Sequence, residues 1–153
     1  SRVNTLYSNE HNIEDIVKTA DVVIGSVLIP GESAPKLLRR EHLKAMRPGS
    51  VLVDVAVDQG GCAETTRPTT QDSPTYIEEG VVHYCVTNMP GAVPRTSTAA
   101  LTHATLPYIR ALADKGIAAA LSGDPHFRRG LNVADGEIRS EPVARALDLP
   151  LRP

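Results

Sequence analysis

Short, nearly continuous apolar runs alternate with helical patterns over the first ninety or so residues of the chain. The runs Val22–Ile29, Val51–Val57 and Val81–Val86 are rich in β-branched residues, as expected for parallel strands buried on both faces. Before the first run, residues 13–20 place apolar side chains at the i, i+3, i+4 and i+7 spacing of one helix face, and between the first two runs Pro35–Met46 has leucine anchors typical of a helix. This alternation predicts βαβ units with right-handed crossovers, and therefore an α/β fold.

The pattern changes at residues 88–94, where two prolines and a glycine fall within a short stretch. Such a stretch is stiff and is typical of a connection between domains. We therefore expect two parts, residues 1–94 and residues 95–153.

The second part contains signals for several short elements. A long helical pattern from about Ser97 ends at Gly116, a residue typical of a helix C-cap. Asp135–Gly136 lies between short segments that can form strands, which predicts a tight hairpin. Ser140 is a suitable N-cap for a last helix that extends through Leu147.

The strands predicted in the first part make up only part of a doubly wound, Rossmann-type sheet. Such a sheet begins with a strand, a glycine-rich turn and a helix that holds a pyrophosphate. No G-x-G-x-x-G occurs in this sequence, and Gly60–Gly61 has no helical pattern behind it. The sequence also predicts a short strand at Val3–Tyr7 and a polar loop over residues 58–79. In the strand order 3-2-1-4-5-6 the missing first strand is central, so an apolar edge is expected to be exposed. We expect that the chain was cut from a longer one, the alternative being a partner that supplies the missing half.

The composition is that of a globular protein, with 41% hydrophobic and 22% charged residues. A net charge of -2 argues against a nucleic-acid or anionic-membrane partner. No apolar run approaches the roughly 20 residues that span a bilayer. Cys62 and Cys85 lack metal-ligand spacing, and Cys85 is expected to be buried in a strand. These features predict a cytoplasmic protein without a metal site.

Three segments of the sequence resemble alanine dehydrogenases closely. They are VLIPG at residues 27–31 with APK at 34–36, PGSVLVDVAVDQGGC at 48–62, and HYCVTNMPGAVPRTST at 83–98. The motifs in the last two segments are long and unusual, and the resemblance extends nearly end to end. The α subunit of proton-translocating nicotinamide nucleotide transhydrogenase shares the fold and parts of this pattern, and is the nearest alternative.

The resemblance implies an enzyme that oxidises L-alanine with NAD and water to pyruvate, ammonium and NADH, and catalyses the reverse reaction. It implies a partial NAD-binding domain in residues 1–94 and the helical C-terminal part of a substrate domain in residues 95–153. The active site would lie in the cleft between the two domains of a homohexamer. The choice between NAD and NADP stays open, because the acidic residue that usually reads the ribose belongs to the missing first part.

Asp58 is the residue to which we assign a catalytic role. It is expected just beyond the carboxyl end of a buried strand, where open α/β sheets bind ligands. In the enzymes that the chain resembles, the aspartate of the DQGG motif assists proton transfer while water attacks an imino acid. The alternative is an aspartate that only caps or shapes a loop. Gly60 and Gly61 would either let the backbone approach a ligand or form a simple turn. Asp54, earlier in the same run, is expected to be structural.

The resemblance also assigns cofactor contacts to residues at the ends of the predicted strands. Val27 and Leu28 would line the nicotinamide-ribose site, Asn88 and Met89 the nicotinamide end, and Ser8 the vicinity of the adenine. On sequence alone, these would be core, turn and loop residues. The full set of expected cofactor contacts is Ser8, Val27, Leu28, Val55, Asp58, Asn88 and Met89.

None of the five histidines is assigned a catalytic role. The resemblance implies that the catalytic histidine and the substrate-binding lysine come from an N-terminal substrate domain outside this chain. His83 is expected on a buried strand, His103 on a helix, and His11, His42 and His126 in exposed contexts. A third alternative is a module without catalysis that only oligomerises or binds nucleotide.

Overall fold

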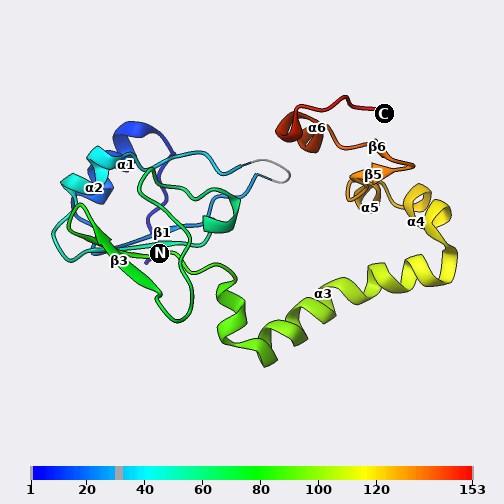
Figure 1. Cartoon of the computed structure of the whole chain (residues 1–153), viewed down its shortest axis with the longest axis horizontal. Helices are drawn as coiled ribbons and strands as arrows, with labels where there is room; N and C mark the ends of the chain where they lie inside the picture. The colour runs from blue at the N-terminus through cyan, green and yellow to red at the C-terminus, as the bar shows by residue number, and fades with distance from the viewer. Residues whose placement is uncertain (1, 30–32, 153) are drawn as a thin grey trace. The chain divides into compact units, whose positions relative to one another are not determined.

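The computed structural model describes residues 2–29 and 33–152, which form two compact units (Figure 1). The division falls between Met89 and Pro90, inside the stretch where the sequence predicts a connection. The turn expected at Pro30–Gly31 lies outside the described residues. Every expected site residue belongs to the first unit.

The first unit is built on a sheet with the strand order β1-β2-β4-β3. Strands β1 (Val22–Gly25), β2 (Val51–Asp54) and β4 (Val81–Tyr84) are parallel, while β3 (Thr75–Glu78) is antiparallel to β4. The predicted parallel α/β sheet is therefore confirmed. The expectation of an unbroken loop over residues 58–79 is wrong, because β3 forms at its end and pairs with β4.

All three predicted strands are shorter than their apolar runs, and β4 ends at Tyr84 and not at Val86. β1 ends at Gly25 and not at Ile29, and β2 ends at Asp54 and not at Val57. The parallel register pairs Gly25 with Asp54, and beyond this pair the chain turns into a short 3-10 helix, η1 (Val57–Gln59). The apolar character continues past the last pair of the ladder into residues of mixed burial, since Val57 is buried while Leu28 and Val55 are exposed.

The strand expected at Val3–Tyr7 does not form, since residues 2–9 contain neither helix nor strand up to the start of α1. A strand needs a neighbour with which to exchange hydrogen bonds. β1 pairs only with β2 among the described residues, and its Val22 and Ile24 are 54% and 66% exposed. The apolar edge that the sequence predicts is therefore present.

The helices of the first unit cover one face of the sheet and close its core. α1 (Glu10–Val17) begins at Asn9, whose side chain accepts a hydrogen bond from Asn12 N, and α2 (Arg40–Ala45) packs near it. The helix expected from Pro35 begins only at Arg40. The preceding Leu38 is hydrogen-bonded through its backbone to Cys62 and Glu64, which belong to the loop after η1 (residues 60–66). The core cluster consists of Val17, Leu38, Leu43, Met46, Leu52, Ala63 and Val81.

The second unit is mainly helical. The predicted C-cap at Gly116, hairpin at Asp135–Gly136 and N-cap at Ser140 are confirmed. None of the helices within residues 2–29 and 33–152 is both long and apolar enough to cross a membrane. The boundary between the units falls within η2 (Met89–Ala92), and the elements that follow are α3 (Pro94–Lys115), α4 (Ile117–Gly123), α5 (Pro125–Arg128), β5 (Val133–Ala134), β6 (Glu137–Ile138) and α6 (Glu141–Leu147).

Candidate functional site

Three loops leave the sheet at one edge, which is formed by the carboxyl ends of β1, β2 and β4. Because β1, β2 and β4 are parallel, the segments that follow them leave the sheet at the same side. These segments are residues 26–28, residues 55–58 and residues 87–89. The first two are tied together where Val55 N donates to the Gly25 carbonyl at 2.8 Å. Six of the seven expected cofactor contacts therefore lie on loops at this edge.

Asp58 lies in η1, four residues beyond the end of β2. The expectation that it directly follows the strand is corrected in this detail. Its side chain is exposed, and no hydrogen bond or ion pair joins its carboxylate to another residue in the described part of the chain. An exposed carboxylate without a partner, at the end of an α/β sheet where ligands usually bind, is a candidate general base.

Asp54 is structural, as the sequence predicts. It is completely buried at the end of β2, with Oδ1 accepting from Ala56 N at 3.0 Å. Oδ2 accepts from Cys62 N and from Thr66 Oγ1, each at 2.7 Å. The buried carboxylate thus holds both ends of the turn on which Asp58 is located.

The loop after η1 requires two consecutive glycines. Gly60 and Gly61 have φ values of 96° and 79°, a region that costs other residues free energy. At Gly61 a Cβ would lie 2.6 Å from Thr66 Cγ2, so the close approach is made by a protein side chain. The turn interpretation of these glycines is therefore sufficient.

The other expected cofactor contacts occupy two different environments. Ser8 and Val27 line one largely apolar cavity of about 230 Å³, bounded by α1, β1 and residues 37–38. Leu28 and Val55 are exposed and lie outside its lining, as do Asn88, a left-handed turn residue with φ 54°, and Met89 at the start of η2. Only Ser8 and Val27 are therefore brought together in this cavity.

Two residues next to Asp58 received no role in the sequence interpretation. Gln59 Oε1 is the buried side-chain oxygen without a hydrogen-bond partner within the described ranges. Lys36 Nζ donates to the carbonyl oxygens of Gly60 and Ala63. Both lie inside the segments quoted for the resemblance, but no spacing in the sequence indicates these contacts.

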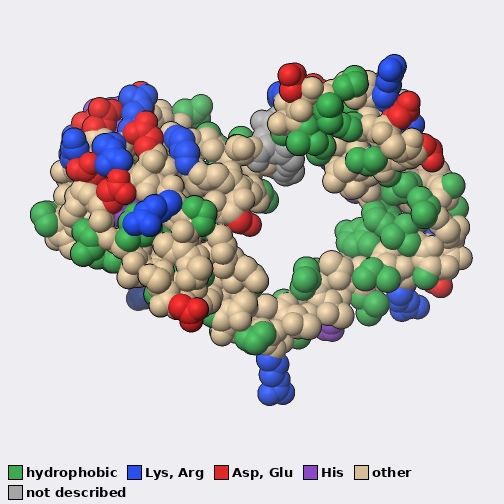
Figure 2. Space-filling view, viewed as in Figure 1, with side chains coloured by type: hydrophobic (Ala, Val, Ile, Leu, Met, Phe, Trp, Pro, Cys, Tyr) green, Lys and Arg blue, Asp and Glu red, His purple; other side chains and the backbone are tan. Residues whose placement is uncertain are grey.

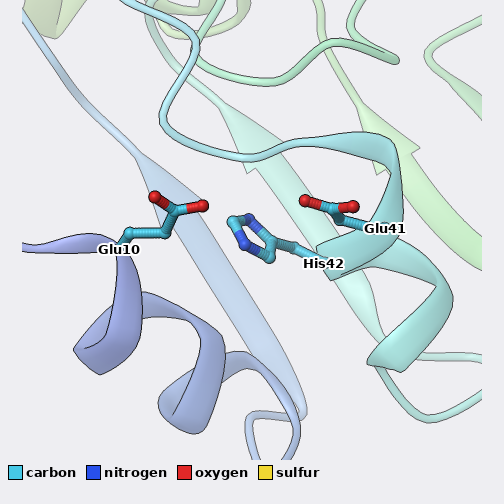
Figure 3. A group of neighbouring side chains, drawn as sticks. All are labelled: Glu10, Glu41 and His42. Carbon is cyan, nitrogen blue, oxygen red and sulfur yellow. The ribbon is translucent and has the colours of Figure 1, made fainter.

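One group of side chains has the composition of a metal site, Glu10, Glu41 and His42 (Figure 3). His42 is 4% exposed, so the expectation that it lies in an exposed context is wrong. It is buried because it completes the start of α2, where its Nδ1 accepts from Arg39 N at 3.2 Å.

The geometry of this group favours an ion-pair cluster over a metal site. Arg39 Nη1 lies 2.7 Å from Glu10 and 3.4 Å from Glu41, so a guanidinium already balances both carboxylates. With Nδ1 accepting a hydrogen bond, the proton of neutral His42 is on Nε2, which leaves no free lone pair for a cation. Basic and acidic side chains also alternate over α1 and α2 in Figure 2, as expected for paired surface charges.

His83 is buried in β4, as predicted, and both its ring nitrogens are engaged. Nδ1 donates to the Val81 carbonyl at 2.9 Å, and Nε2 lies 2.8 Å from Thr65 Oγ1. The ring stacks on Tyr76 with centroids 4.8 Å apart. A histidine held in this way packs the sheet and is not available for proton transfer to a ligand. His103 lies on α3, as expected.

Both cysteines are free and buried, and we expect them to be chemically inert in the folded protein. Burial, followed by the Asp54 carboxylate, raises the pKa of the Cys62 thiol to about 12, and burial also raises the pKa of Cys85. The reactive thiolate is therefore nearly absent at pH 8. Iodoacetamide labelling followed by peptide mass spectrometry should leave both thiols unmodified in native protein and modify both in urea. Rapid labelling of native Cys62 would contradict this expectation.

Comparison with known proteins gives consistent matches. Residues 1–141 match the family described as alanine dehydrogenase/PNT, C-terminal domain. An alanine dehydrogenase from Halomonas elongata is 58% identical over 148 residues, which cover 97% of this chain and 40% of that protein. A solved L-alanine dehydrogenase structure has a TM-score of 0.78 at 51% identity and covers 97% of this chain and 41% of its own.

A transhydrogenase structure from Sinorhizobium meliloti is less similar. It has a TM-score of 0.54 at 32% identity, covering 60% of this chain and 26% of its own. The chain spans about 40% of the length of the curated relatives it matches.

Proposed function

Because this chain belongs to the alanine dehydrogenase/PNT C-terminal domain family, we propose that it forms part of an NAD-dependent L-alanine dehydrogenase. The complete enzyme would convert L-alanine, NAD and water to pyruvate, ammonium and NADH, and would catalyse the reverse reaction. The identity of 58% over nearly the whole chain favours this activity over that of a transhydrogenase subunit, for which identity is 32%.

The observation that carries the proposal is the unpaired carboxylate of Asp58 at the ligand-binding edge of the sheet. Oxidation of an amino acid at Cα gives an imino acid, which water must attack before ammonium leaves. A general base near the reacting carbon accelerates such a step by accepting a proton from that water. Asp58 is free of competing partners within the described residues, and it lies on a loop fixed by the buried Asp54.

The residues at this edge also fit a nicotinamide cofactor. Exposed apolar side chains of Leu28 and Val55 and the thioether of Met89 offer packing surfaces for a flat ring, while Asn88 offers an amide that can hydrogen-bond. NAD, when bound, supplies the acceptor for the hydride that leaves the substrate Cα. On this chain, Ser8, Val27, Leu28, Val55, Asn88 and Met89 would hold and orient it, and Asp58 would manage the proton.

The proposal includes the partners that the sequence implies. L-alanine and pyruvate would be the substrate and product, and residues 95–153 would belong to the substrate domain of the complete enzyme. The N-terminal part of the enzyme would supply the glycine-rich turn, the substrate-binding lysine and the catalytic histidine, and the whole would assemble as a homohexamer. The two free thiols support a reducing, cytoplasmic location.

The direct test compares the full-length protein with the 153-residue chain in an assay of NADH formation from L-alanine. We expect turnover by the full-length protein and none by the chain alone, because a single carboxylate cannot bind the cofactor phosphates or the substrate. Binding of NADH is measured in parallel by calorimetry. Tight binding without deamination would favour a transhydrogenase subunit, and neither binding nor turnover would favour a module without catalysis. Turnover by the chain alone would contradict the assignment of these roles to the N-terminal part.

A further inference from the structure

We propose that Lys36 is a positioning residue for Asp58, because it holds the loop after η1 and thereby fixes the place of the Asp58 carboxylate. The inference rests on the proposed function, since it requires Asp58 to act as a base. Lys36 belongs to the first unit, and it is not the substrate-binding lysine that is expected in the N-terminal part of the enzyme.

The contacts of Lys36 are made with the backbone of that loop. Its ammonium donates to the Gly60 carbonyl and, at 3.0 Å, to the Ala63 carbonyl. These two carbonyls flank the turn Gly61–Cys62. Gly60 is the C-cap of η1 and lies two residues after Asp58, so the bond reaches the end of the element that contains the base.

The loop is held from two directions by opposite charges. Asp54 accepts the loop's N–H groups from the buried side, through Ala56 N and Cys62 N. Lys36 donates to the loop's carbonyls from the exposed side. Among the described residues, Lys36 is the donor that satisfies the Gly60 carbonyl. Charge-assisted hydrogen bonds are about twice as strong as neutral ones, which suits them to fixing a glycine turn.

The segment around Lys36 is itself aligned with the loop. Ala34 N donates to the Gln59 carbonyl at 2.8 Å, and Leu38 N donates to the Cys62 carbonyl at 3.0 Å. Leu38 and Ala63 form a parallel bridge between the two segments. Lys36 lies midway along this ladder, opposite the two left-handed glycines, where the backbone alone makes no bond to the Gly60 carbonyl.

A positioning role follows from the isolation of the base. Asp58 has no hydrogen bond of its own within the described ranges, so its position depends on the backbone that carries it. A displacement of about 1 Å at a reacting group can lower a rate by about 100-fold. Loss of the Lys36 ammonium would leave two glycines, the most flexible of residues, to set that position.

The test uses the full-length enzyme with the substitutions Lys36→Met and Lys36→Arg. We expect Lys36→Met to lower kcat at least about tenfold, with KM for NAD changed less than about threefold and the unfolding midpoint nearly unchanged. Lys36→Arg should recover much of kcat, because a guanidinium can also donate to two carbonyls. Lys44→Met, which removes an exposed lysine from α2, is the matched control and should leave kcat unchanged.

A double-mutant cycle separates positioning from a general structural effect. In an Asp58→Asn background, measured at high enzyme concentration, Lys36→Met should change the remaining turnover less than about twofold, because the group that it positions is gone. An equal loss of kcat in both backgrounds, or a Lys36→Met enzyme with wild-type kcat, would overturn the inference. Absence of alanine-dependent NADH formation by the wild-type enzyme would instead refute the proposed function.

Discussion

Replacement of Asp58 by Asn in the full-length enzyme should lower kcat for alanine deamination by at least about 100-fold. Asn keeps the size and polarity of the side chain but cannot accept a proton near neutral pH. The free carboxylate of Asp58 makes no hydrogen bond or ion pair within the described residues, so its replacement should remove little folding free energy. The loss should therefore appear in turnover, measured as NADH formation under saturating alanine and NAD.

The control for this substitution is Asp72→Asn, which changes an exposed aspartate elsewhere in residues 58–79. It should leave both kcat and NADH affinity unchanged. For Asp58→Asn, the dissociation constant of NADH should change less than about tenfold, which corresponds to about 1.4 kcal/mol. An Asp58→Asn enzyme with kcat close to that of the wild type would show that Asp58 only shapes the loop.

The positions of the three parallel strands could be predicted from the sequence, but their ends could not. The run from Val51 gives β2, a central strand whose Leu52 and Asp54 are buried and whose Val51 and Val53 are half-buried, so that neither face is exposed. The same run continues to Val57, which is buried although it lies in η1. Apolar residues thus occur in the strand, in the buried turn that follows it and at the exposed Val55 between them, so they do not mark the last residue of the strand.

The missed strand and the shortened helix have a different cause. β3 has only half-buried residues at alternate positions, Tyr76 and Glu78, and its pairing depends on β4, the next strand in the chain. Residues 35–39 have a helical pattern, yet the backbone N–H and carbonyl of Leu38 are bonded to Cys62 and Glu64 in the loop after η1. In both cases a tertiary partner overrides the local pattern.

The residue types of the site could be predicted better than their contacts. A structural role for Asp54 follows from its place inside a buried run, since a carboxylate there requires donors. The burial of His42 could not be predicted, because it depends on Nδ1 completing the first turn of α2. The contacts of Lys36 could not be predicted either, because its hydrogen bonds reach carbonyls that are 24 and 27 residues away.

Replacement of Asp54 by Asn should destabilise the first unit by about 3 kcal/mol, the largest stability effect that we expect from a single polar substitution here. The carboxylate is completely buried and accepts from Ala56 N, Cys62 N and Thr66 Oγ1. An Asn side chain has only one acceptor oxygen. In either orientation its amide group faces at least one backbone N–H, which leaves a buried donor without a partner.

Thr66→Val separates this effect from the loss of an ordinary hydrogen bond. It removes one donor from Asp54 and leaves the two backbone bonds intact, so the cost should be about 1 kcal/mol. The two variants are compared with the wild type by urea unfolding of the full-length protein. The measurement follows the unfolding transition of the first unit. Because the Asp54 turn also holds η1, Asp54→Asn should lower turnover as well, whereas Thr66→Val should largely preserve it. Equal midpoints for Asp54→Asn and the wild type would mean that the loop around Asp58 is held by Lys36 and the backbone ladder without the buried carboxylate.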